Sequence, residues 1–164
     1  MLRILANDFG PNHGYTLFED KGTVAGDYTL TSWQKHYGDD GHKPLRRDLA
    51  TLIKGVDIFI GERFLFLHEF RDRDKIDLTA AEYIGVAKVA CRTRYPGSVV
   101  EVWQNAAQAC GQTAFWGDSK EGNDKIKKLG LWQPNHKHAM DSLRHFLYYY
   151  TFTLNSTYFL EQLK

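Results

Sequence analysis

Short apolar runs bounded by turn residues dominate the first thirty residues of the chain. Residues 2–8 (LRILAND) form an apolar, β-compatible run that ends just before a Gly-Pro pair, which is typical of a strand followed by a tight turn. Two further strand-like runs, 15–20 and 23–30, are separated by a Lys-Gly pair. This pattern predicts an antiparallel meander of three strands.

Helical spacing follows this meander and then alternates with strands. Leucines at helical spacing predict a helix over residues 43–55, with Gly55 as its candidate C-cap, and the apolar run 56–62 predicts a fourth strand. The Ala-rich segment 77–97 predicts a second helix that stops at a Pro-Gly pair. Residues 98–103 predict a fifth strand.

Three more helices are predicted after the fifth strand. They cover residues 105–110, 119–130 and 133–154, and the last has Asn135 as its candidate N-cap. Strands that first form hairpins and then alternate with helices indicate a mixed sheet flanked by helices. We therefore predict an α/β fold in a single domain over residues 1–164, with a five-stranded mixed sheet whose first three strands are antiparallel.

Composition narrows the class of protein. A chain of 164 residues has room for one ordinary domain but not for the two lobes of a protein kinase, although Asp8-Phe9-Gly10 matches a kinase triplet. No apolar run approaches the roughly 18 residues that a membrane span requires, and the N-terminus has no signal-peptide pattern. We expect a soluble, cytoplasmic protein. Cys91 and Cys110 lack a CxxC spacing, so we expect two reduced thiols.

Basic residues are concentrated in two segments of the chain, although the net charge is small. The net charge of +1 neither demands nor excludes a nucleic-acid partner. Basic residues gather in segments 43–54 and 120–128. Such segments are either solvated helix faces or nucleic-acid contacts, and charge alone leaves both interpretations open.

Carboxylates stand at the ends of two predicted strands. Asp8 ends the first strand and Glu62 ends the fourth, so the two side chains converge if these strands are neighbours in the sheet. Converging carboxylates raise one another's pKa, and a divalent cation would keep them ionised. Oxygen ligands suit Mg²⁺ or Mn²⁺, and two such ions roughly 4 Å apart can bind both the attacking and the leaving oxygen of a phosphodiester.

The last predicted helix carries a second set of polar residues. His138, Asp141 and His145 lie within about 60° of one another on a helical projection, nearly opposite an apolar stripe. Taken alone, this face is simply the solvated side of the helix. Taken with Asp8 and Glu62, it offers further metal ligands. A zinc site formed by His136, His138 and Asp141 is a rival interpretation, although it lacks a thiolate.

Three segments together resemble the RuvC-type Holliday junction resolvases, and more closely the phage-encoded branch. They are ILANDFGPNHGY (4–15), DIFIGERF (57–64) and HKHAMDSLRHFL (136–147), and the resemblance extends from Leu2 to about Tyr150. It implies a ribonuclease H-like fold, a homodimer, branched DNA as the substrate and, if phage-encoded, the cytoplasm of a bacterial host. Phe9 departs from the pattern, because bacterial members have Pro there.

The resemblance also implies the residues of the site. Asp8, Glu62, His138 and Asp141 match the family's metal-binding quartet, which implies Mg²⁺ or Mn²⁺ with two ions per active site. His138 stands at a position that is Asp in some members and His in others, so it is either a ligand or a proton-transfer group. His136 and His145 are weaker candidates for the site.

Candidate DNA contacts follow Glu62 and lie in the basic segment near residue 125. One aromatic near Glu62 is expected to stack on unpaired bases, which is worth about 1 to 3 kcal/mol per base, and basic residues are expected to hold phosphates. The candidates are Phe64, Phe66, Arg71, Arg73, Lys75, Lys125, Lys127 and Lys128. The alternative places both phenylalanines in the core beside a solvated loop. The helix from about Leu78 to Tyr95 is the candidate dimer interface.

These features predict a metal-dependent, structure-selective endonuclease that resolves four-way (Holliday) and other branched DNA. One alternative is a non-catalytic module that keeps the fold to bind branched nucleic acid. A second alternative is a small phosphate- or nucleotide-hydrolysing enzyme, because Asp8-x-Gly10 followed by Gly14 also resembles the first phosphate loop of actin-like ATPases. Those enzymes need a second lobe, for which this chain has no room.

Overall fold

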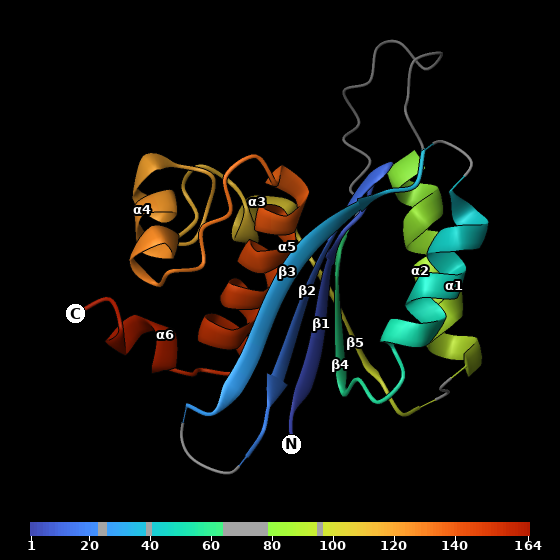
Figure 1. Cartoon of the computed structure of the whole chain (residues 1–164), viewed down its shortest axis with the longest axis horizontal. Helices are drawn as coiled ribbons and strands as arrows, with labels where there is room; N and C mark the ends of the chain where they lie inside the picture. Colours follow the sequence, from blue (N-terminus) through green and yellow to red (C-terminus); the bar gives the residue numbers. More distant parts are fainter. Residues whose placement is uncertain (23–25, 39–40, 64–78, 95–96) are drawn as a thin grey trace.

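A central sheet separates two layers of helices in the computed structural model, which describes residues 1–22, 26–38, 41–63, 79–94 and 97–164 (Figure 1). In chain order the strands are β1 (Arg3–Asp8), β2 (Asn12–Asp20), β3 (Tyr28–His36), β4 (Ile58–Glu62) and β5 (Val100–Gln104). Their order across the sheet is β3-β2-β1-β4-β5. The first three strands pair antiparallel, whereas β4 pairs parallel with both β1 and β5. The predicted five-stranded mixed sheet is therefore confirmed.

Helices cover both faces of this sheet (Figure 1). Helices α1 (His42–Leu52) and α2 (Thr79–Arg94) form one layer. The other layer contains α3 (Ala106–Ala109), α4 (Lys120–Lys128), α5 (Lys137–Tyr148), a π-helical turn η2 (Tyr149–Thr153) and α6 (Tyr158–Glu161). In the part of the chain that the structure describes, no helix is both long enough and apolar enough to cross a membrane.

Strand β1 is apolar on both faces because both faces are covered. Ile4 and Ala6 belong to the apolar cluster on the α5 side, whereas Leu5 belongs to the cluster beneath α1 and α2. All three side chains are fully buried. A strand covered on both sides reads as a continuous apolar run rather than an alternating one, which is the pattern seen in residues 2–8.

Several predicted boundaries were wrong. The third strand was expected at residues 23–30 but spans Tyr28–His36, because it pairs along the whole of β2. The N-cap of α5 is His136 rather than Asn135, whose φ of 65° places it in the left-handed region before the helix. Helix α1 has its C-cap at Ile53, and Gly55 follows with a φ of 75°.

Gly14 is required by the close approach of α5 to β2. A Cβ atom at this position would lie 1.9 Å from the carbonyl oxygen of His138 and 2.3 Å from its carbonyl carbon. Gly14 is also the residue of β2 that pairs with Asp8 of β1. The missing side chain therefore allows the first turn of α5 to rest on the sheet beside the end of β1.

Replacing Gly14 by Ala should force α5 away from β2. We expect Gly14→Ala to lower the free energy of unfolding by about 1 to 3 kcal/mol, because overpacking displaces backbone. The matched control is Gly85→Ala at an exposed position of α2, where an added Cβ meets no atom of the same chain within 4 Å and should stabilise the folded monomer by about 0.5 to 1 kcal/mol. Urea unfolding measures both values. Equal stability of Gly14→Ala and the wild type would contradict the contact.

Candidate active site

Polar side chains meet where three neighbouring strands end. Asp8 ends β1, Glu62 ends β4 and Gln104 ends β5. Because β1, β4 and β5 run in the same direction, their carboxyl ends share one edge of the sheet, and Glu62 pairs in register with Gln104. The sheet therefore brings Asp8 and Glu62 together, as their position at strand ends predicted.

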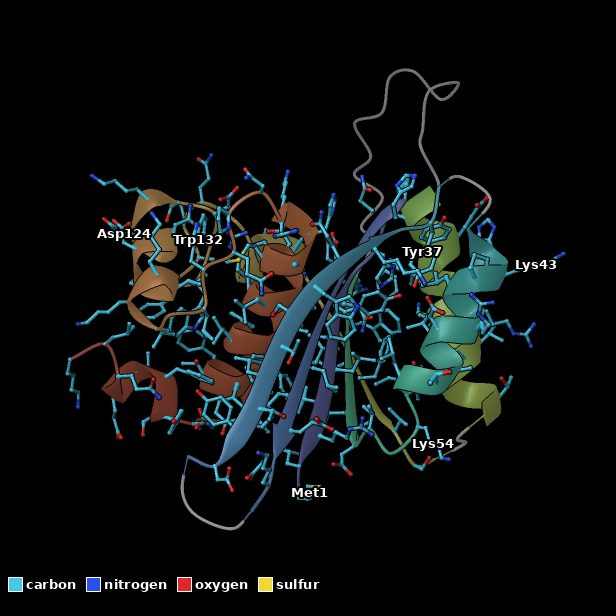
Figure 2. All side chains as sticks on the ribbon, viewed as in Figure 1. Met1, Tyr37, Lys43, Lys54, Asp124 and Trp132 are labelled. Carbon is cyan, nitrogen blue, oxygen red and sulfur yellow. The ribbon has the colours of Figure 1, made fainter. Side chains whose placement is uncertain are left out.

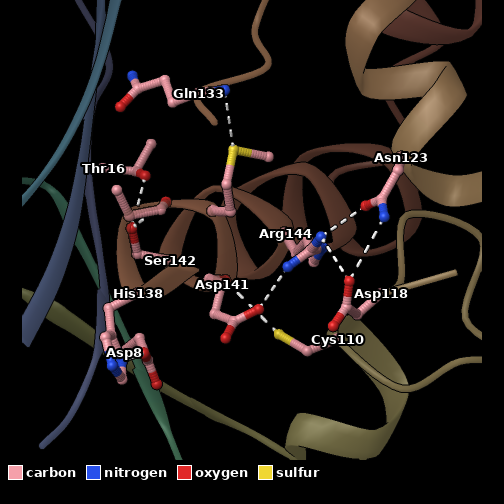
Figure 3. A network of polar contacts seen from close by, with 12 residues as sticks. Asp8, Thr16, Cys110, Asp118, Asn123, Gln133, His138, Asp141, Ser142 and Arg144 are labelled. Atoms are coloured by element: carbon pink, nitrogen blue, oxygen red, sulfur yellow. Dashed lines mark hydrogen bonds and ion pairs between the residues drawn. The ribbon is translucent and has the colours of Figure 1, made fainter. Parts of the chain in front are cut away.

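Helix α5 adds two residues to this edge. His138 lies in its first turn, and its Nδ1 is 2.7 Å from Oδ2 of Asp8, a contact between residues 130 positions apart (Figure 3). Asp141 lies one turn further along α5, and its charge acts on both Asp8 and Glu62. The structure thus gathers the four residues predicted for the site, although their roles stay predictions.

The carboxylates of this cluster destabilise one another. Burial raises the pKa of Glu62 to about 7, with further contributions from the charge of Asp8, a hydrogen bond with Asp8 and the charge of Asp141. Burial and the charge of Asp8 also raise the pKa of Asp141, against the opposing effect of Arg144. The hydrogen bond to Asp8 raises the pKa of His138. The protonation states of these three acids and the imidazole therefore depend on one another.

The chemistry of this donor set fits a divalent cation. Three carboxylates suit Mg²⁺ or Mn²⁺, and a bound cation would favour the ionised form of Glu62, whose pKa is raised by burial and by the neighbouring carboxylates. In the structure, the Asp8 carboxylate is hydrogen-bonded to His138, and the Asp141 carboxylate accepts a hydrogen bond from Arg144. Among the described residues, no three His, Cys, Asp or Glu side chains are already grouped around one ion position. This applies equally to the predicted quartet and to the zinc set with His136.

Sequence reasoning missed two further polar residues, Arg144 and Gln104, and named His145 only as a weaker candidate for the site. Arg144 is buried and contacts Asp141, and Nδ1 of the buried His145 lies 2.8 Å from Oε1 of Gln104. The three-residue spacing of Asp141 and Arg144 on a helix was the available signal for the first pair. The second pair joins residues distant in sequence and left no such signal.

The solvated-face interpretation of α5 was wrong for His145. This side chain is fully buried, and burial lowers its pKa to about 4, so the imidazole is neutral at pH 7. Helix α3 packs against α5, and Gln104 at the end of β5 supplies a polar partner for the buried imidazole. A polar stripe on a helix indicates that polar groups face it. For His145 the polar group is a protein side chain and not water.

The presence of Phe at position 9 is explained by its packing on the α2 side of the sheet. Its ring lies 6.2 Å from that of Trp103 and 4.8 Å from that of His13, and the side chain is 5% exposed. Gly61 makes room for this cluster, because a Cβ there would lie 2.5 Å from the Trp103 ring and 3.0 Å from that of Phe9. Phe9 thus anchors the chain directly after Asp8.

The predicted DNA contacts fall into two groups. Phe64, Phe66, Arg71, Arg73 and Lys75 lie outside the described residues. Lys125, Lys127 and Lys128 occupy the C-terminal part of α4 and make local contacts. Lys125 Nζ lies 3.9 Å from the centre of the Phe115 ring, Lys127 is 3.3 Å from Asp124, and Lys128 donates to the carbonyl of Leu163. Their binding to DNA stays a prediction.

Solved structures share this fold across nearly the whole chain. RuvC from Thermus thermophilus has a TM-score of 0.67 at 15% identity, covering 94% of this chain and 96% of that one. The fowlpox virus Holliday junction resolvase has a TM-score of 0.54 at 17% identity, covering 90% and 97%. The yeast mitochondrial resolvase Ydc2 has a TM-score of 0.53 at 11% identity, covering 99% and 80%.

These likenesses confirm the predicted RuvC-like, ribonuclease H-like fold. No protein-family model matches the chain, and the comparison with curated proteins found no match. At identities of 11 to 17%, the shared feature is the fold. The activity is therefore argued from the residues of the site.

Replacing Glu62 by Gln tests the cost of ionising this side chain in the absence of metal, a cost set first by burial and then by the neighbouring carboxylates. The pKa of Glu62 is raised from 4.5 to about 7 on folding, so its contribution to stability is fully present below pH 4.5 and is lost as the pH rises through 7. The uncharged amide of the Glu62→Gln variant has no such loss. We therefore expect Glu62→Gln to gain about 2 kcal/mol over the wild type between pH 4 and pH 8, after discounting for partial exposure.

Urea unfolding in EDTA at pH 4, 6 and 8 measures this gain. The control is Glu121→Gln, which removes an exposed carboxylate from the first turn of α4 and should differ from the wild type by less than about 0.5 kcal/mol. A Glu62→Gln difference that does not change with pH would show that Glu62 is not under electrostatic strain.

Proposed function

We propose that the chain is a metal-dependent, structure-selective endonuclease that hydrolyses phosphodiester bonds in four-way and other branched DNA. The observation that carries the proposal is the convergence of Asp8, Glu62, His138 and Asp141 at one edge of a RuvC-like sheet. Two of the structures that share the fold are described as complexes with Holliday junction DNA, from T. thermophilus RuvC and the fowlpox virus resolvase.

The four residues would hold Mg²⁺ or Mn²⁺, with two ions in each site. When bound, such ions lower the pKa of a water molecule and stabilise the charge that develops on phosphate oxygens. The protein's own part is to keep the oxygen donors together despite their repulsion. Strand pairing holds Asp8 and Glu62, while the contact at Gly14 fixes the start of α5 and hence His138.

The two ring nitrogens of His138 have different roles in this proposal. Nδ1 is hydrogen-bonded to Asp8, which fixes the orientation of the ring. Nε2 is therefore the nitrogen that would bind an ion or hold a proton during the reaction. The imidazole side chain is only partly buried, which such a role requires.

DNA requires positive charge beside this acidic edge. We infer that Lys125, Lys127 and Lys128 on α4 contribute it, together with Arg71, Arg73 and the aromatic residues Phe64 and Phe66, which would stack on unpaired bases. Lys127 and Lys128 are exposed, so phosphates can reach them.

A homodimer would present two sites to the two sides of a junction. We propose helix α2 as the core of its interface. Val89 on α2 is 48% exposed and Val100 on β5 is 60% exposed, and the ion pair between Arg92 and Glu101 shows that the two elements are neighbours. Exposed aliphatic side chains on adjoining elements are a feature of protein interfaces.

Cleavage assays test the proposed function. Labelled four-way junction, flap and linear duplex are incubated with Mg²⁺, Mn²⁺ or EDTA. We expect cleavage of branched substrates that needs a divalent ion and falls about 100-fold or more in Asp8→Asn and Glu62→Gln, because each variant removes a charged oxygen donor. Glu121→Gln should cleave like the wild type.

Two results would contradict this proposal. Undiminished cleavage by both acidic-site variants would place the chemistry elsewhere. Tight junction binding without cleavage under any metal condition would instead identify a non-catalytic binding module on the same fold.

A further inference from the structure

Arg144 is a buried cation next to the candidate metal centre. It lies on α5, one turn after Asp141, and is 2% exposed. Its Nη1 is 2.5 Å from Oδ1 of Asp141, and its Nη2 is 2.7 Å from Oδ1 of Asn123 and 3.3 Å from Oδ1 of Asp118 (Figure 3). One planar guanidinium group thus joins Asp141 to two residues outside its own helix.

This contact ties Asp141 to the layer that contains α4. Asn123 belongs to α4, and Asp118 lies just before that helix. The main chain of Asp141 is held from the same direction, because the thiol of Cys110 donates to its carbonyl oxygen at 3.5 Å. The segment between β5 and α5 therefore contacts the backbone of Asp141 directly and its carboxylate through Arg144; this segment is visible beside α5 in Figures 1 and 2.

Stability alone gives a poor account of this arrangement. Burying an ion pair costs desolvation, and apolar replacements of similar volume are often neutral or stabilising. The Nε of Arg144 is buried and has no hydrogen-bond partner among the described residues. A buried donor without a partner loses its hydrogen bonds to water and gains none in return. A side chain that served only the core would avoid both costs.

We propose that Arg144 is a positioning residue of the metal centre, which holds the Asp141 carboxylate in the orientation that a divalent ion requires. The inference rests on the proposed function, because it takes Asp141 as a ligand. A guanidinium group binds a carboxylate in a fixed planar geometry, which an ammonium group cannot reproduce. Residues that orient metal ligands typically change metal affinity about 10- to 100-fold when they are replaced.

Binding of MnCl₂ to the DNA-free protein tests this inference by isothermal titration calorimetry at one pH. We expect Arg144→Lys, which keeps the charge but loses the fork, and Arg144→Gln to weaken Mn²⁺ binding by about 10- to 100-fold. Asn123→Ala keeps the contact with Asp141 but removes one anchor, so a smaller loss is expected. This variant also provides a test if Arg144→Gln does not fold.

The matched control for a merely structural role is Leu143→Ala. Leu143 neighbours Arg144 on α5 and is 1% exposed, so its truncation should leave a cavity in the core and lower the midpoint of thermal unfolding. It should nevertheless bind Mn²⁺ within about twofold of the wild type. Thermal unfolding in EDTA provides the stability of each variant for comparison.

The outcomes separate this inference from the proposed function. Wild-type Mn²⁺ affinity in folded Arg144→Lys and Asn123→Ala would overturn the positioning role while leaving the metal centre intact. An equal loss of affinity in Leu143→Ala would also overturn it, because general destabilisation would then account for the effect. Absence of Mn²⁺ binding by the wild type would overturn both the metal centre and the role of Arg144.

Discussion

The close approach of α5 to β2 at Gly14 is the contact on which the candidate site depends. The carbonyl group of His138 occupies the space that a side chain would need at Gly14. Since Gly14 pairs with Asp8, this contact brings the start of α5 to the end of β1 and allows His138 to bond to Asp8. A local property of one residue thus joins segments 130 positions apart. Displacing the helix would separate the imidazole from the carboxylates without changing any of them.

Several groups at the same edge of the sheet are unfavourable for the stability of the fold. Burial and mutual repulsion raise the pKa of Glu62 and Asp141, and Arg144 carries an unpaired buried nitrogen. The large apolar clusters on both faces of the sheet supply stability that offsets these costs. Strained functional sites commonly persist in this way on a stable scaffold. This repulsion is one of the observations that support the proposal of a divalent cation at the site.

Sequence reasoning succeeded where the determining interactions are local. The order of strands and helices followed from periodicity, and the position of Asp8 and Glu62 at strand ends followed from where the apolar runs stop. It failed where a partner distant in sequence decides. The third strand is set by its pairing with β2, and the polar partner of the buried His145 is Gln104 of β5. The need for glycine at position 14 is visible only when α5 is in place.

Phe9 stands where the resemblance to bacterial resolvases implies Pro. This difference changes which interaction restrains the backbone after Asp8. Proline would restrict the backbone after Asp8 through its ring, whereas Phe9 does so by packing against Trp103 above Gly61. On the other side of Asp8, the amide of Asn7 donates to the carbonyl of Ile60 on β4 and contacts His13 on β2. Asp8 therefore lies between one residue bonded to both neighbouring strands and one anchored in an apolar cluster. Side-chain packing can thus replace a ring constraint in holding a carboxylate at the end of a strand.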